Sequence, residues 1–234
     1  MTSLVQPARV LIDPIDGTQA AVEARRWVWP VLILALCVSA SGTLFSLRWD
    51  AAPDVIRDLQ ASGGMAGLSE ADLTDQIQTA TRKSLVGAIA KGVFLMPLVT
   101  LLLACALWVV AWLFDRPAPF GRLMSAAAVS LLPVALYNAI FAVCAAAQHT
   151  LTAERAGRLV PSHLGAVLEG LSPKMMRVAT AVDFFSLWGA VLLGLGFAAA
   201  TGMPRGRAVV LGLVMYAMYA GVMMIGLPAM GGGR

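Results

Sequence analysis

A composition too apolar for a water-soluble domain, together with five long uncharged runs, predicts an all-α, polytopic membrane protein. Of the 234 residues, 59% are hydrophobic and 13% are charged, and this charged share is about half that of soluble domains. Such a chain has too little polar surface to cover itself in water. The runs lack the alternating polar positions of barrel strands, so we expect a bundle of five transmembrane helices with juxtamembrane helices outside the membrane.

The spans follow from the spacing of charged residues, because hydrocarbon about 30 Å thick requires roughly 20 helical residues. Uncharged runs of this length give predicted spans at 27–47, 92–114, 123–147, 184–204 and 208–230. The third run stays uncharged beyond Ala147, but the polar triplet that follows places its exit there. We therefore divide the chain into a short leader, 1–26, and a single five-span membrane domain, 27–233.

The connections between the spans differ in length. The links at 115–122 and 202–207 are short, so spans two and three, and spans four and five, are predicted to form tight antiparallel hairpins. We also expect the last two spans to pack tightly on each other. The connections at 48–91 and 148–183 are long and polar enough to leave the membrane.

Both long connections contain a helix-start signal. Ser69 with Asp72 three residues later resembles a capping box, so 69–84 is predicted to be a helix that feeds span two. We interpret it as a solvated juxtamembrane helix, with a partner-binding helix as the alternative. Ser172-Pro173 has the pattern of an N-cap followed by a first-turn proline, and this second helix is predicted to continue into span four.

Basic residues predict the orientation. The N-terminal side has seven, all in short segments: Arg9, Arg25, Arg26, Arg116, Arg122, Arg205 and Arg207. The other side has more basic residues, but nearly all lie in long loops, which count less in the positive-inside rule. We therefore expect the N-terminus and both basic turns in the cytoplasm and the C-terminus outside, although the raw totals favour the reverse.

Pro133 and Asn138 stand out inside the third span. Like Pro30 and Pro97, Pro133 removes a backbone donor and can kink its helix, which is common in membranes. Asn138 follows it by a little more than one turn. We interpret this amide as part of an interhelical hydrogen bond that stabilises the bundle, and a transport site is the alternative.

Small residues recur at four-residue spacing in the last two spans. Ala190 with Gly194, and Ala217 with Gly221, form such pairs. This spacing lets helix backbones approach closely in lipid, where packing replaces the hydrophobic driving force. We expect these pairs to be helix-contact positions.

Asp183 lies at the start of the fourth span, where an ionisable group is a functional candidate. Water can reach a residue near the membrane boundary, so we favour structural hydrogen bonding, with donors from a neighbouring helix, over proton or ion handling. With Trp188, an indole suited to the membrane interface or a tight helix contact, it is predicted to organise the outer end of the bundle.

No set of residues indicates catalysis, a cofactor or a metal site. His149 and His163 are the only histidines, and neither lies in a metal-binding spacing. The sequence has no nucleophile elbow, ATP-binding loop or dinucleotide fingerprint. We therefore expect no enzymatic activity and no cofactor. The net charge of +4 is small and does not indicate a nucleic-acid partner.

Three stretches resemble the Yip-domain (Ypt-interacting-protein) family: LIDPIDGTQAAVEARRWVWPVLI, FGRLMSAAAVSLLPVALYN and VDFFSLWGAVLLGLGFAAATGMPRGRA. The last is the most specific, and together they span most of the chain apart from the two long connections. The resemblance carries over as fold and interface positions onto Pro14, Pro30, Gly121, Pro133, Asp183, Phe184, Leu187, Trp188 and Gly196.

The resemblance implies a non-enzymatic membrane protein whose partners are membrane lipids and other integral membrane proteins. Eukaryotic relatives resemble trafficking adaptors that engage small GTPases through cytosolic segments much longer than this leader. An Ala-, Gly- and Arg-rich composition fits a bacterial inner (cytoplasmic) membrane member, and some of those resemble accessory subunits of ATP-binding-cassette exporters with a periplasmic adaptor. The alternative is a small stand-alone transporter or channel that uses Asp183, Asn138 and the proline-broken spans.

Overall fold

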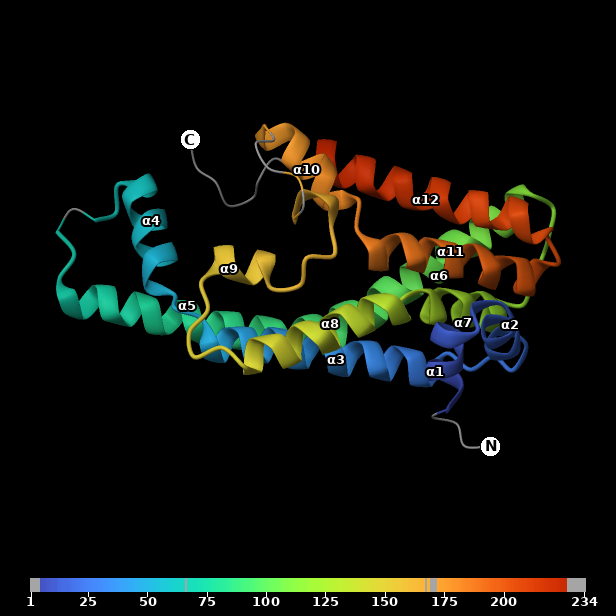
Figure 1. Ribbon diagram of the computed structural model, residues 1–234, viewed down its shortest axis with the longest axis horizontal. Coiled ribbons are helices and arrows are strands. Elements are labelled where there is room, and N and C mark those ends of the chain that lie inside the picture. The colour runs from blue at the N-terminus through green and yellow to red at the C-terminus, as the bar shows by residue number, and fades with distance from the viewer. Residues whose placement is uncertain (1–4, 66, 167, 169–171, 227–234) are drawn as a thin grey trace.

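The computed structural model describes residues 5–65, 67–166, 168 and 172–226, and these form helices joined by turns and loops, with two isolated β-bridges (Figure 1). The all-α membrane fold predicted from the sequence is confirmed. The α-helices are α1 (Val5–Ile12), α2 (Pro14–Glu23), α3 (Val28–Arg48), α4 (Ala52–Ser62), α5 (Glu70–Ala90), α6 (Met96–Leu113), α7 (Phe120–Ser130), α8 (Leu132–Ala146), α9 (Ala153–Arg158), α10 (Pro173–Ala181), α11 (Phe184–Thr201) and α12 (Arg205–Gly226). A π-helical turn, η1 (Lys91–Leu95), joins α5 to α6, and a 3-10 turn, η2 (Leu164–Ala166), precedes α10.

Four helical stretches of the described chain are long and apolar enough to cross a membrane. They are Val28–Arg48, Glu70–Leu113, Phe120–Ala146 and Phe184–Thr201, and they contain or overlap the first four predicted spans. The fifth predicted span falls on α12, and its last residues, 227–230, lie outside the described residues. The count of five spans stays a prediction.

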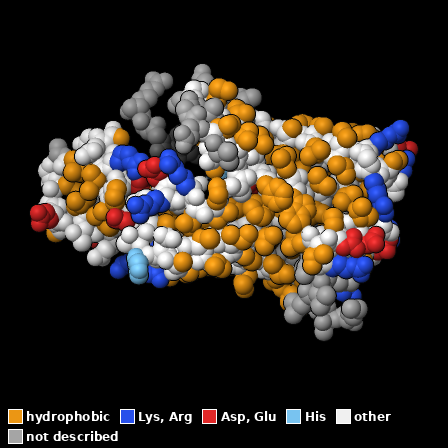
Figure 2. All heavy atoms as spheres, viewed as in Figure 1, with side chains coloured by type: hydrophobic (Ala, Val, Ile, Leu, Met, Phe, Trp, Pro, Cys, Tyr) orange, Lys and Arg blue, Asp and Glu red, His pale blue; other side chains and the backbone are white. Residues whose placement is uncertain are grey.

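The long helices lie side by side along the long axis of the molecule (Figure 1). Helix α3 packs on α8 and α5, while α11 packs on α12, α7, α2 and α8. The two predicted hairpins are present, since α6 contacts α7 and α11 contacts α12. Figure 2 shows a broad hydrophobic surface over the body of the bundle, with charged side chains gathered toward its two ends, as a membrane protein requires.

Helices α5, η1 and α6 form one continuous stretch of 44 residues. Its start is the predicted capping box: the Ser69 hydroxyl accepts from the Asp72 N–H, and the Asp72 carboxylate accepts from the Ser69 N–H. The π turn lies directly before Pro97, which lacks an N–H and whose ring would crowd a regular turn. At 1.5 Å per residue the stretch is about 66 Å long, about twice the hydrocarbon thickness.

Two predicted helices are interrupted. Helix α10 begins as expected, with Ser172 as N-cap, but its predicted continuation into span four is wrong. The chain leaves the helix at Val182 because the backbones of Val182 and Phe184 form hydrogen bonds with a segment of the preceding loop. The third span is also broken, at Leu131, so that Pro133 falls in the first turn of α8, where a missing N–H costs no helix hydrogen bond.

The leader is part of the folded body, which its polar sequence does not indicate. Helices α1 and α2 pack on each other, and α2 packs across α11 and α7. Val10, Thr18 and Val22 are fully buried. A Cβ added at Gly17 would lie 2.8 Å from the Val10 backbone nitrogen, so α1 and α2 meet through a position that only glycine can occupy.

Candidate functional site

Asp183 caps the N-terminus of α11. Its Oδ2 atom accepts hydrogen bonds from the Ser186 N–H and from the Ser186 hydroxyl, both at 2.8 Å. These donors belong to the first turn of the same helix, whereas the sequence suggested donors from a neighbouring helix. The second oxygen, Oδ1, is buried and has no hydrogen-bond partner among the described residues. A buried acceptor without a partner costs free energy, so this oxygen is an unsatisfied polar atom of the site.

A short antiparallel bridge brings His163 opposite Asp183. The Leu164 N–H donates to the Val182 carbonyl and the Phe184 N–H donates to the Ser162 carbonyl, each at 3.0 Å. These two bonds flank His163 and Asp183, which therefore form a non-hydrogen-bonded pair, whose Cα atoms typically lie about 4.5 Å apart with the side chains on one face. The bridge therefore fixes the two backbones opposite each other, but within the described residues no hydrogen bond joins the imidazole to the carboxylate.

Aromatic side chains surround this end of α11. The Phe184 ring packs against Phe185 at 5.4 Å and against Trp188 at 5.7 Å between centroids. Tyr137 of α8 meets Phe185 edge-on at 5.6 Å. The hydroxyl of Tyr216, on α12, donates to the Ala181 carbonyl at the end of α10. These aromatic contacts and the Tyr216 hydrogen bond join α8, α10, α11 and α12 at the end of α11 where Asp183 lies.

Asn138 forms the interhelical hydrogen bond that the sequence suggested. Its Oδ1 atom accepts from the Ser41 hydroxyl of α3 at 2.6 Å, and its Nδ2 donates to the Val134 carbonyl at 2.8 Å. The amide oxygen therefore joins α8 to α3, while the amide N–H donates within α8 itself. This is the arrangement expected of a structural amide at membrane depth.

The close contact between α11 and α12 uses Gly194 as predicted, but its partners on α12 differ from the prediction. A Cβ at Gly194 would lie 2.5 Å from the Ala208 carbonyl oxygen, and one at Gly212 would collide with the Ala190 carbonyl. Gly221 has no atom within 4 Å of a Cβ position, and Ala217 is exposed. The Ala217 and Gly221 pair is therefore not in close contact with α11. The two helices approach most closely near Ala208 and Gly212, earlier along α12.

The opposite face of α11 is equally close to α7, a contact that sequence spacing alone did not identify. A Cβ at Gly189 would lie 2.7 Å from the Ser130 carbonyl oxygen, and one at Gly196 would lie 2.8 Å from the Ala126 Cβ. Gly189 and Gly196 are seven residues apart, about two helical turns, so they lie on one face of α11. This spacing is the sequence pattern that could have indicated the contact with α7. We call the contacts of α11 with α7 and α12 the glycine seam.

Both basic turns and the leader meet at the other end of the bundle, which we call the basic end. Arg116 donates to the Gly202 carbonyl, and Arg205 donates to Gln19 Oε1 of α2, each at 3.2 Å. Arg25 lies against Gly121, in the first turn of α7. The structure thus gathers the arginines that the orientation prediction used, while the side of the membrane on which they lie stays a prediction.

The Asp183 end can accept a hydrogen bond or a proton at one carboxylate oxygen, and the glycine seam can only pack. In the part of the chain that the structure describes, no three His, Cys, Asp or Glu side chains lie together as a metal site would need. His149 lies outside the bridge that contains His163.

A family model, the Yip1 domain, matches residues 8–226. The match runs from the buried leader helix α1 to the end of α12 and so includes both ends of the bundle and the glycine seam. No curated protein and no solved structure matches this chain.

Proposed function

The chain belongs to the Yip1-domain family of membrane proteins, and on that premise we propose that it is a non-enzymatic accessory subunit that binds other membrane proteins. The family match covers most of the chain, and the apolar helices agree with an integral membrane protein. The proposal is that its surfaces, rather than a catalytic centre, perform its function.

The observation that carries this proposal is a projecting arm, made of α4 and residues 70–83 of α5. The Ser46 and Ser84 hydroxyls lie 2.7 Å apart near the end of α3, so residues 70–83 continue beyond it (Figure 1). Neither α4 nor α5 contains a buried residue. Short helices in water are usually stabilised by burying an apolar face, so an arm that buries none supports a role in contacting another protein.

The arm is held in place locally. Trp49, just after α3, donates from its indole nitrogen to Asp54 of α4 at 2.9 Å, and the capping box fixes the start of α5. A fixed arm on the side opposite the basic turns would be periplasmic in the predicted orientation. That placement supports an ATP-binding-cassette exporter with a periplasmic adaptor as the partner assembly in a bacterial inner membrane.

A second surface supports contact within the membrane. Helix α12 packs mainly on α11, and Met218 and Val222 on its outer side are each 66% exposed. The Ala217 and Gly221 pair lies among these residues, and small residues at this spacing allow a helix of another subunit to approach closely.

The test is photo-crosslinking from a single photoreactive residue at Gln76, exposed on the arm, in native membranes. The matched control is the same residue at Arg207, exposed at the basic end. We expect Gln76 to label a periplasmic or membrane protein that also co-purifies with the chain. Replacing 53–82 by a short linker should abolish co-purification while leaving the thermal stability of the bundle unchanged, because no residue of α4 or α5 is fully buried. A chain that isolates alone, with the arm labelling only lipid, would contradict the proposal.

The unpartnered Oδ1 atom of Asp183 favours one alternative, a small transporter or channel. Two phenol rings lie at the same end of α11, because Tyr137 packs edge-on against Phe185 and the Tyr216 hydroxyl donates to the Ala181 carbonyl. Purified protein in liposomes distinguishes the two functions. Flux of a proton or solute without partners, lost in Asp183→Asn, would support transport and remove the accessory proposal.

A further inference from the structure

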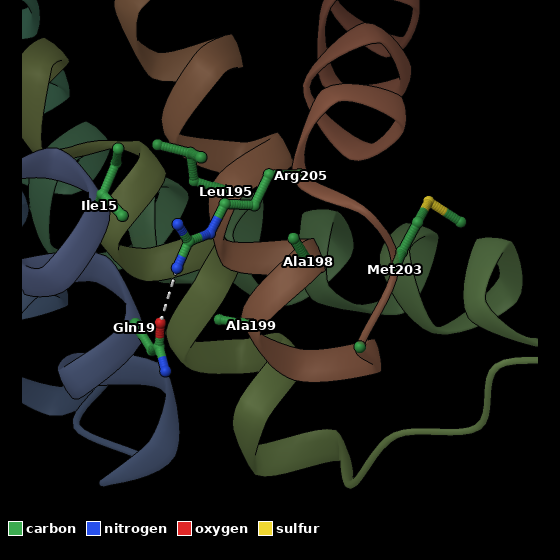
Figure 3. Close-up of a pocket in the computed structure, with 8 residues that line it drawn as sticks. Ile15, Gln19, Leu195, Ala198, Ala199, Met203 and Arg205 are labelled. Carbon is green, nitrogen blue, oxygen red and sulfur yellow. Dashed lines mark hydrogen bonds between the residues drawn. The ribbon is translucent and has the colours of Figure 1, made fainter.

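A cavity of about 270 Å³ lies at the basic end, between the leader helix α2 and the hairpin of α11 and α12 (Figure 3). Its volume corresponds to about nine water molecules at ~30 Å³ each, so it is large enough for part of a ligand. The residues that matter here are Ile15, Gln19, Leu195, Ala198, Ala199 and Arg205.

The polarity of this cavity changes along the axis of α11. Arg205 and Gln19 supply the charged and polar groups, and Figure 3 shows the guanidinium reaching across to the Gln19 side chain. Leu195, Ala198 and Ala199 line the α11 wall. Leu195 lies six residues before the end of α11, about 9 Å deeper into the bundle. A phospholipid has the same order, with a charged headgroup above an apolar chain.

The charge of Arg205 is available to an anion. Its hydrogen bond goes to a neutral amide oxygen, and within the described residues it forms no ion pair. Gln19 is oriented for this contact because its Nε2 atom donates to the Glu23 carboxylate at 2.9 Å, which leaves Oε1 facing Arg205. A guanidinium has five N–H donors, so most of its donors are left for a phosphate.

The charges around the cavity favour an anion overall. The basic end has seven arginines, while its acidic residues are Asp13, Asp16, Glu23 and Asp115. Asp13 is paired with Arg9 at 3.7 Å. Glu23 accepts from Gln19 and thereby orients the amide whose oxygen accepts from Arg205.

We propose that this cavity binds one anionic phospholipid, with its phosphate on Arg205 and the first part of an acyl chain along Leu195 and Ala199. The lipid would contact Ile15 of α2 at the same time. It would therefore link the leader to the α11–α12 hairpin, and the leader's docking would depend on the lipid composition of the membrane.

The experiment measures lipid binding to the full chain in detergent, by native mass spectrometry and by the rise in melting temperature on adding lipid. The probes are phosphatidylglycerol, phosphatidylcholine and inorganic phosphate. We expect phosphatidylglycerol to bind and stabilise most. Arg205→Gln should weaken it about fivefold, the loss expected for one arginine near a charged surface.

Two further variants separate the cavity from general surface charge. Ala199→Leu fills the apolar wall and should weaken phosphatidylglycerol binding while Arg205 is intact. Arg207→Gln removes an exposed arginine from the same turn, outside the cavity lining, and should leave binding unchanged. Equal losses in Arg205→Gln and Arg207→Gln, equal binding of both lipids, or displacement by inorganic phosphate would each overturn the proposal.

Discussion

Helices α11 and α5 are similar in length, with 18 and 21 residues, but opposite in burial. Ten residues of α11 are buried, and α5 has none. Glycines bring α11 against two neighbours at backbone distance, whereas α5 contacts α3 and η1 with one side and α4 only lightly. The comparison separates the part of the molecule that specifies the bundle from the part that is free to meet another protein.

The same residue type has different effects in the two settings. Gly194 and Gly212 allow backbone contact inside the glycine seam, while Gly87 of α5 and Gly221 of α12 have no atom within 4 Å of a Cβ position. A small-residue motif in a membrane helix therefore shows only that close approach is allowed. Its place in the bundle decides whether that approach is used within the chain or is left for a partner.

The largest expected effect comes from breaking the glycine seam. Gly194→Ile places a branched side chain against the Ala208 and Val209 backbone, where even a Cβ lies at 2.5 Å. Overpacking against backbone cannot relax by rotamer change, so we expect a loss of about 3 kcal/mol or more and separation of the hairpin. Thermal unfolding in detergent measures it. The control is Gly221→Ile, which should unfold at the wild-type temperature; equal destabilisation by both would show that the seam is placed wrongly.

The next prediction concerns the cap where the seam begins. Asp183→Leu removes the N-cap of α11 and should cost about 1–2 kcal/mol, since the Ser186 N–H loses its acceptor. Asp183→Asn keeps an acceptor oxygen and should cost less than half as much. Melting temperatures of both variants test the order. A structural role also requires that Asn keeps co-purification; loss of function in a normally folded Asn variant would make the charge or proton essential.

A smaller effect is expected at the contact between α3 and α8. Asn138→Leu removes the hydrogen bond to Ser41, and such bonds in membrane bundles contribute about 0.6 kcal/mol on average. We expect a double-mutant cycle with Ser41→Ala to give a coupling energy of this size. A coupling near zero, with lost liposome flux, would favour the transport interpretation of this amide.

The sequence predicted features that depend on composition or on a few consecutive residues. Spans, hairpins, the capping box at Ser69 and the N-cap at Ser172 all belong to this group, because neighbouring residues supply the physics. The break at Val182 could not be predicted this way. It depends on backbone bonds to Ser162 and Leu164, about 20 residues earlier, which compete with helix continuation.

The candidate sites show the same limit. Asp183 was identifiable by its position at the start of a span, but Tyr137, His163 and Tyr216, which lie at the same end of α11, come from three other parts of the chain. The sequence of the leader gives no sign of its burial, because its buried residues are interspersed with exposed charges. Its burial depends on contacts of α2 with α11 and α7, which are distant in the sequence.

The smallest expected effect on the stability of the whole bundle comes from a change in the arm. Because no residue of α5 is fully buried, its first turn depends on local hydrogen bonds, and Ser69→Ala should destabilise that turn by about 1 kcal/mol. Faster amide exchange at residues 70–76 should follow, with no change in exchange in α11 or in the melting temperature. A lower melting temperature or faster exchange in the glycine seam would show that the arm is coupled to the bundle.

Acid should reproduce the Ser69→Ala effect in the wild-type protein. Hydrogen bonds from the Ser69 hydroxyl and backbone N–H hold the pKa of Asp72 below its usual value. A carboxyl with a lowered pKa in the folded state stabilises that state above the unfolded pKa, near 3.8, and this stabilisation is lost as pH falls through the lowered value. Exchange at 70–76, corrected for its intrinsic pH dependence, should therefore accelerate below about pH 4 in wild type. Asp72→Asn, which cannot ionise, should show no such acceleration. An acceleration of equal size in that variant would assign the effect to another carboxyl group. Glu70 and Asp75 are the nearest carboxyl groups in the sequence of the same helix.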